Sequence, residues 1–152
     1  MKRWIVFCLA AAALFVLPQG QGVDIGEIEP VELLGIQKKS GCIVIATDTG
    51  EFGQGLTVAE AVRDAENTAT GKLFLETVDY VLVTEQIKSE IPELMDILRP
   101  SARLILVKAP MDLEGAAEYL QTHKSEMTLK DWMTGKRELP KLTMVGERYY
   151  LG

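Results

Sequence analysis

Few residues in this chain have the types and spacing that catalysis requires. His123 is the single histidine, and it follows a predicted helix beside Lys124. A positive side chain suits the carboxyl end of a helix, so this position favours a solvated helix end over a general base. Cys42 is the single cysteine after residue 22, in an apolar run that is typical of a small buried side chain rather than a reactive thiol. One histidine and one such cysteine exclude the usual zinc sites.

A glycine-rich stretch, residues 50–55, precedes a predicted helix that begins with Thr57 as its cap. Free N–H groups at a helix start after glycines can hold a phosphate. The glycine spacing differs from the dinucleotide-binding pattern, however, no lysine follows in the loop, and Glu51 would repel an anion. A tight turn before the helix is therefore the favoured interpretation.

Acidic residues are numerous, but no pattern selects a catalytic pair. They include Glu85, Glu90, Glu93, Asp96, Asp112, Glu114 and Glu118. The three-residue spacing of Glu90, Glu93 and Asp96 predicts a solvated helix face. Glu51 and Glu85, beside the glycines, keep one alternative hypothesis open, a small exported carboxylate-dependent hydrolase or ligand-binding protein.

The sequence also contains none of the G-x-S-x-G, H-E-x-x-H and G-x-x-x-x-G-K-[ST] patterns. We therefore predict a non-enzymatic protein with no catalytic residue, no cofactor and no metal ligand. Trp132, Tyr149 and Tyr150 are candidates for either the core or a contact surface.

Residues 1–22 have the layout of an export signal. Lys2 and Arg3 precede an uncharged apolar run, residues 4–17, and Pro18 ends it. As a helix this run reaches about 21 Å, short of a hydrocarbon core of about 30 Å, which favours a signal peptide over a permanent span. An uncleaved signal anchor stays open as the alternative. Both place residues 23–152 outside the cytoplasm.

Residues 23–152 contain 14 basic and 22 acidic side chains, a net charge of −8. This balance argues against nucleic acid, whose phosphates require basic surfaces, and against a polybasic lipid-binding patch.

Apolar periodicity and turn residues predict alternating strands and helices over residues 23–152. Expected strands cover residues 31–37, 42–47, 73–75, 80–83, 103–107, 142–145 and 149–151, with a loop at 49–55. Expected helices cover residues 58–70, 87–98, 113–120 and 129–133, with a stop at Gly71 and caps at Thr57, at Asp112 and at Thr128 or Ser125. Pro92 fits a first helical turn near Glu90. The predicted class is α/β, one domain with a mixed β-sheet packed by about three to four helices and preceded by the signal helix.

Several segments resemble one known family. Residues 53–75 read Gly-Gln-Gly-Leu-Thr-Val-Ala-Glu-Ala and later Lys-Leu-Phe-Leu. They resemble the N-terminal domain of the spore germination receptor lipoproteins, the C-subunit or Ger(x)C family. Other similar segments, in the family's order, are residues 23–28, 33–36, 81–85, 91–98 and 99–107. The resemblance covers residue 23 to about residue 120, but Gly22 stands where the family has its lipidated cysteine, and Val23 where it has tryptophan.

The resemblance implies a non-catalytic subunit that works beside integral membrane subunits in nutrient-induced germination. We expect an exported or membrane-associated protein at the outer face of the cytoplasmic or inner spore membrane, or a secreted one if the signal is cleaved. Its expected partners are membrane germination receptor subunits. It would meet the membrane only through those partners or an uncleaved signal, and we expect its interface near Trp132, Tyr149 and Tyr150. The departures leave a remnant, an accessory paralogue or a split subunit as possible identities.

Overall fold

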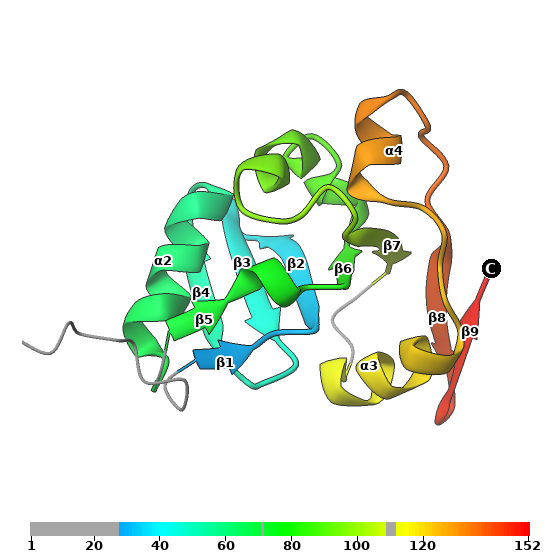
Figure 1. Ribbon diagram of the computed structural model, residues 1–152, viewed down its shortest axis with the longest axis horizontal. Helices are drawn as coiled ribbons and strands as arrows, with labels where there is room; N and C mark the ends of the chain where they lie inside the picture. Colours follow the sequence, from blue (N-terminus) through cyan, green and yellow to red (C-terminus); the bar gives the residue numbers. More distant parts are fainter. Residues whose placement is uncertain (1–27, 71, 109–111) are drawn as a thin grey trace, which may run out of the picture.

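A seven-stranded mixed sheet organises the chain (Figure 1), for which the computed structural model describes residues 28–70, 72–108 and 112–152. In spatial order its strands are β4 (Phe52–Gly55), β3 (Cys42–Thr47), β2 (Leu33–Lys39), β6 (Tyr80–Val83), β7 (Arg103–Val107), β8 (Lys141–Val145) and β9 (Arg148–Leu151). The four central strands, β2, β6, β7 and β8, run parallel. Antiparallel pairings add β3 and β4 at one side and β9 at the other. A separate parallel pair joins β1 (Ile28–Pro30) to β5 (Lys72–Phe74).

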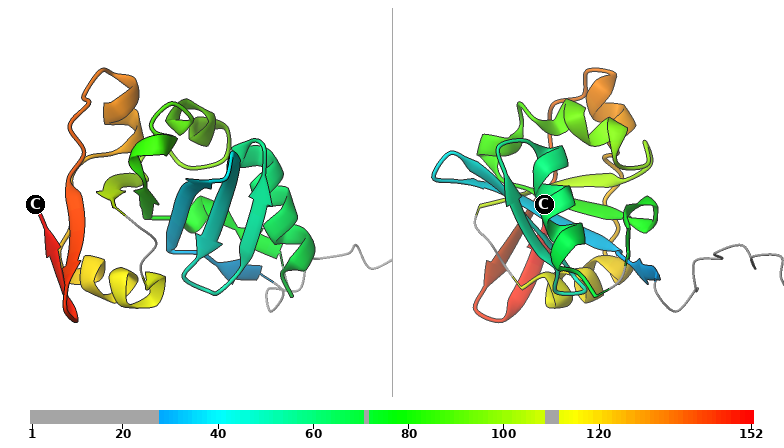
Figure 2. Two further views of the ribbon diagram at one scale, coloured as in Figure 1. Left: turned by 180° about the vertical axis from the view of Figure 1, so that it is seen from behind. Right: turned by 90° about the vertical axis from the view of Figure 1, so that its left-hand side faces the viewer.

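Helical segments cover both faces of this sheet (Figures 1 and 2). One face packs against α2 (Val58–Thr68), α4 (Leu129–Met133) and three 3₁₀ segments, η2 (Leu75–Thr77), η3 (Glu85–Ile87) and η4 (Ile91–Asp96). The other face packs against α3 (Leu113–Thr122). The predicted α/β class with a mixed sheet is confirmed. The predicted signal, residues 1–22, and the predicted stop at Gly71 lie outside the described residues.

Strand β6 shows how the two faces share the core. Val81 and Val83 point into the larger apolar cluster, which holds α2, η4 and α4, whereas Tyr80 and Leu82 point into the cluster under α3. All four side chains are buried. A strand covered on both faces needs an unbroken apolar run, and Tyr-Val-Leu-Val at residues 80–83 provides one.

Helix starts follow the local cap chemistry expected from the sequence. The Thr57 hydroxyl accepts the Glu60 N–H at 3.2 Å, and Asp112 accepts the Glu114 N–H at 3.2 Å. For α4 the cap is Thr128 rather than Ser125, because Thr128 and Asp131 exchange side-chain and backbone hydrogen bonds in a capping box.

The predicted helix over residues 87–98 is wrong as a continuous α-helix. The structure has two 3₁₀ segments there, η3 and η4, and Pro92 lies in the first turn of η4. Proline lacks an N–H and its ring clashes with the carbonyl four residues earlier, which prevents one α-helix from running through this point. The two 3₁₀ segments still place apolar side chains in the core, because Ile87, Ile91 and Leu94 are fully buried.

The predicted loop over residues 49–55 is wrong in its second half, because Phe52–Gly55 forms the edge strand β4. Its glycines serve close packing. A Cβ at Gly53 would lie 2.1 Å from the Ala61 carbonyl oxygen, and one at Gly55 would lie 2.5 Å from the Glu60 Cβ. Glycine at these positions lets α2 lie directly on the strand. Close packing, and not the predicted tight turn, therefore explains why these residues are glycines.

Candidate functional site

The two carboxylates proposed for hydrolysis lie at opposite ends of the sheet. Glu51 follows β3, at the end where β2 begins, since Thr47 pairs with Leu34. Glu85 follows β6, at the end where β2 and β6 finish. Glu51 accepts the Thr47 hydroxyl at 2.9 Å, and Glu85 is paired with Lys88 at 2.5 Å. The structure therefore does not bring this pair together.

The predicted solvated face is right for Glu93 and Asp96 but wrong for Glu90, whose side chain is only 15% exposed. Glu93, Asp96, Glu114 and Glu118 are exposed, and Asp112 caps α3. Glu90 binds the Lys38 ammonium at 3.0 Å, and hydrogen bonds from Ser89 and Lys38 lower its pKa. Within the described ranges, no group of three or more acidic, histidine or cysteine side chains is placed to hold a metal ion.

His123 and Cys42 are both in structural positions. His123 ends α3, its ring stacks on Tyr119 with centroids 4.1 Å apart, and its Nδ1 lies 2.9 Å from the Thr122 hydroxyl. Cys42 begins β3 as a free, half-buried thiol, more exposed than its apolar run predicts. Neither residue lies in a constellation that would activate it.

The amino terminus of α2 uses its own side chains to cap its N–H groups. Glu60 accepts the Leu56 N–H at 2.8 Å, and Thr57 accepts the Glu60 N–H. A bound phosphate would need free N–H donors at this point, but the Glu60 carboxylate already lies there. The preceding residues Gly53 and Gly55 pack against the helix. This geometry agrees with the sequence analysis in not favouring a phosphate site.

A polar hollow of about 310 Å³ lies where β2, β6 and β7 begin, beside α3. Lys124 is one of its four charged lining residues, and the other three have contacts within the chain. Glu32 accepts Gln121 Nε2 at 3.4 Å, Asp79 binds the Arg99 guanidinium at 2.5 Å, and Arg103 lies 5.2 Å from the centre of the Tyr80 ring. Burial raises the pKa of Tyr80, whose hydroxyl donates to the Leu120 carbonyl. The contacts of Glu32, Asp79 and Arg103 are separate and do not share a centre.

The two edges of the sheet differ in a way that bears on partner binding. At the β4 edge, the Asp64 carboxylate accepts the Gln54 N–H at 2.9 Å, and the Thr68 hydroxyl donates to the Phe52 carbonyl at 3.3 Å. Side chains of helix α2 thus occupy two outward backbone groups of β4, the Gln54 N–H and the Phe52 carbonyl. Such cover is a usual protection of an edge strand against pairing with another chain.

None of the described segments covers the β9 edge in this way. Lys141 and Gly152 exchange backbone hydrogen bonds of 2.6 and 3.0 Å, which sets the alternation of the β8–β9 ladder. By that alternation, the N–H and C=O groups of Tyr149 and Leu151 point away from β8. No described strand lies beyond β9. This strand is therefore the open edge of the described sheet.

Exposed apolar side chains accompany the open edge on the terminal hairpin, residues 141–151. Met144, Val145 and Tyr150 are 49%, 67% and 51% exposed. The register places Val145 and Tyr150 on the same face, turned away from α3. Tyr150 was a candidate from its residue type, whereas Met144 and Val145 were not. Adjacent apolar residues at the end of a terminal strand were the signal that one of them extends past the core.

Of the other two aromatic candidates, one lies in the core and the other packs against α3. Trp132 is 5% exposed and belongs to the larger core cluster. The Tyr149 ring packs near Tyr119, and its hydroxyl donates to the Asp112 carbonyl at 3.2 Å. Of the three aromatics expected near an interface, the structure therefore leaves Tyr150 most available.

Across residues 28–70, 72–108 and 112–152, no helix combines the length and the hydrophobicity needed to cross a bilayer. In comparisons with family models, curated proteins and solved structures, no match to this chain was found.

Proposed function

We propose that this chain is a non-enzymatic, exported or membrane-associated protein that acts by binding another protein, in the manner of a germination receptor subunit. The observation that carries the proposal is the asymmetry of the sheet, whose β4 edge is bonded by α2 while its β9 edge is open and flanked by exposed apolar side chains. The separation of Glu51 from Glu85 supports this function over the hydrolase alternative. The segment order shared with the Ger(x)C lipoproteins supports membrane germination receptor subunits as the partners.

The proposed mode of binding is addition of a strand. An extended segment of the partner pairs with β9 through the outward backbone groups of Tyr149 and Leu151. Backbone pairing supplies affinity, and Val145 and Tyr150 supply apolar contact on the face away from α3. The partner strand therefore carries apolar side chains at alternate positions on that face.

The test uses a double variant, Val145→Lys with Tyr150→Lys, in the full chain. Both positions are more than half exposed, so the fold should tolerate the change, while two charges at a protein-protein contact should weaken binding at least tenfold. The measurements are co-purification with identified germination receptor subunits from detergent extracts of the source cells, and nutrient-induced germination of spores that carry the variant.

Leu56→Lys is the matched control, because Leu56 is 73% exposed and follows β4 at the other edge. It should behave as the natural chain in both measurements. The proposal fails if no receptor subunit co-purifies, if the double variant binds as well as the natural chain, or if the edge is used only by a second copy of this chain.

A further inference from the structure

The terminal hairpin is positively charged on the face that a strand added to β9 would meet. By the register, the side chains turned away from α3 on this hairpin are those of Lys141, Thr143, Val145, Arg148 and Tyr150. Two of them are basic and none is acidic, and Glu147 lies in the turn between the strands. The whole chain, by contrast, has a formal net charge of −6. This face therefore differs in charge from the rest of the molecule.

Neither cation on this face is neutralised by the described part of the chain. Arg148 is exposed and Lys141 half-buried, and neither takes part in an ion pair there. The basic side chains that do so are Lys38, Lys88, Arg99 and Lys136. A carboxylate from a partner would thus meet charges that have no ion pair to give up, and hydrogen bonds between ionised groups are stronger than neutral ones.

The geometry of strand addition brings side chains of a partner next to Arg148 and Tyr150. The outward N–H and C=O groups of Tyr149 and Leu151 would pair with an added antiparallel strand. Residues between those hydrogen-bonded positions face the added strand at the shorter Cα separation, about 4.5 Å, where side chains lie closer together. A carboxylate opposite Arg148 is therefore within reach of its guanidinium, and an apolar side chain opposite Tyr150 packs on the ring.

Lys141 reaches the same added strand because Gly152 lies between them. Lys141 and Gly152 exchange backbone hydrogen bonds, so the added residue opposite Gly152 would lie two strand spacings, about 10 Å, from Lys141. Gly152 has no side chain to block that path, and the flexible side chains of lysine and glutamate together span it. The four-residue separation of Arg148 and Gly152 sets the spacing of the two acidic positions.

We propose that the partner strand carries two acidic side chains, opposite Arg148 and Gly152, with one apolar side chain between them, opposite Tyr150. Its sequence pattern is acidic, any residue, apolar, any residue, acidic. This inference rests on the proposed function and deepens it by naming the charge of the partner. The backbone of β9 supplies the pairing, and the two cations select the partner.

The same charges disfavour a second copy of this chain as the occupant. Antiparallel pairing of two β9 strands about Tyr150 would place Arg148 of one copy opposite Gly152 of the other, and so beside Lys141 of that copy. Like charges at neighbouring positions of a sheet repel each other. A different protein with an acidic strand is therefore the favoured occupant.

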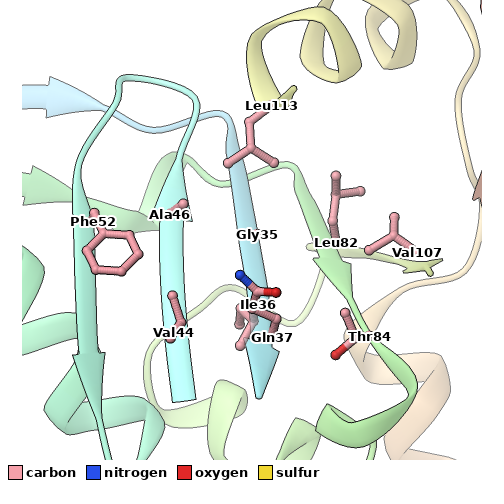
Figure 3. A pocket seen from close by; sticks show the side chains of 10 residues that line it. All are labelled: Gly35, Ile36, Gln37, Val44, Ala46, Phe52, Leu82, Thr84, Val107 and Leu113. Carbon is pink, nitrogen blue, oxygen red and sulfur yellow. The ribbon is translucent and has the colours of Figure 1, made fainter. Parts of the chain in front are cut away.

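A second region of the sheet is less suited to a protein partner. A mostly apolar pocket of about 80 Å³ lies over β2, β3 and β4, with Leu113 at one end (Figure 3). Its described lining residues carry no charge, so they do not select an acidic or a basic partner. Side chains of α2 also bond two outward groups of the neighbouring β4 edge. We therefore place strand addition at β9.

The experiment titrates the ¹⁵N-labelled full chain, in a mild non-ionic detergent, with a capped peptide of sequence Thr-Glu-Thr-Val-Thr-Glu-Thr. Two further peptides replace both glutamates with glutamine or with lysine. The amide signals of Tyr149 and Leu151 report pairing at the β9 edge. We expect saturable shifts with the glutamate peptide at a Kd of about 1 mM, about fivefold weaker binding of the glutamine peptide and at least about tenfold weaker binding of the lysine peptide.

A double charge reversal tests the two cations. In Lys141→Glu with Arg148→Glu, the order of the peptides should invert, with the lysine peptide bound at least about fivefold more tightly than the glutamate peptide. This gain of binding also shows that the variant is folded. Lys39→Glu with Arg63→Glu is the matched control, because it changes the net charge equally at exposed positions of β2 and α2, and it should keep the natural order.

The inference is overturned if the glutamine or the lysine peptide binds the natural chain as tightly as the glutamate peptide, or if the double reversal keeps the natural order. In either case strand addition at β9 still stands, because the shifts of Tyr149 and Leu151 show it. If none of the peptides moves these signals up to about 20 mM, strand addition itself fails, and the proposed mode of binding fails with it.

Discussion

At the scale of single residues, buried polar atoms without partners mark the places where this fold departs from ordinary packing. Among the described residues these atoms are Asp48 Oδ1, Thr84 Oγ1 and Arg99 Nε. Thr47 shows the ordinary case, since its hydroxyl accepts the Glu51 N–H at 3.0 Å and donates to the Glu51 carboxylate. Thr84 follows β6, whereas Asp48 lies in the turn after β3.

The Asp48 carboxyl makes a prediction about pH. Burial raises its pKa, although hydrogen bonds from the backbone at Leu33 and its neighbours act in the opposite direction. A raised pKa in the folded state means that folding favours the protonated acid, so this stabilisation is present below the ordinary pKa of about 3.9 and is lost as pH rises through the folded-state value.

We therefore expect Asp48→Asn to raise stability at pH 7 and to give a smaller difference at pH 3. Urea unfolding at both pH values measures the change. Asp96→Asn, at an exposed position, is the control and should shift stability little at either pH. A variant that is less stable than the natural chain at pH 7 would contradict this account.

At the scale of elements, the contact between α2 and β4 depends on glycine. We expect Gly53→Ala to destabilise the protein by about 1–3 kcal/mol or more, because its Cβ would overlap the Ala61 carbonyl and Ala65 nitrogen, both of them backbone atoms that cannot rotate away. Thermal unfolding measures the loss. Gly152→Ala, which would meet nothing within 4 Å, is the matched control and should leave stability unchanged. Equal stability of the two variants would show that α2 does not lie on the strand.

The same contact explains why part of the fold was not predictable from the sequence. Each helix cap is a hydrogen bond to an N–H group two or three residues away, from Thr57, Asp112 or Thr128. The caps could therefore be predicted from the local sequence. Strand β4 could not, since three glycines within residues 50–55 indicate a loop, whereas Gly53 and Gly55 pair with β3 and lie against a helix later in the chain. Pro92 similarly marked a helix start but did not reveal that η4 would be a 3₁₀ segment.

At the scale of the whole molecule, the two apolar clusters lie on opposite faces of one sheet and share β2, β6 and β7. Losing either cluster exposes strands that the other needs, which predicts a single cooperative unfolding transition. Leu104→Ala, in the larger cluster, and Leu120→Ala, under α3, should each cost about 2–5 kcal/mol, since both side chains are fully buried.

The measurement is urea unfolding followed by both far-ultraviolet circular dichroism and tryptophan fluorescence, in a Trp4→Phe background so that the fluorescence reports on Trp132 in the larger cluster. The two signals should change together in both variants. Met133→Ala, at a position 48% exposed, serves as the control and should change stability by about 0.5 kcal/mol or less. A separate transition in Leu120→Ala would mean that α3 and the terminal hairpin unfold as their own unit.

The sequence by itself determined the strands β3, β6 and β7 at their observed bounds, the helix caps and the mixed α/β class. Each depends on apolar periodicity or on hydrogen bonds between near neighbours, which the order of residues encodes directly. The candidate sites needed the tertiary structure. Whether Trp132 and Tyr150 were core or surface, which edge of the sheet α2 would bond, and how far α3 would reach across the sheet are set by packing between distant segments. Burial and strand order belong to that packing, and no local pattern encodes them.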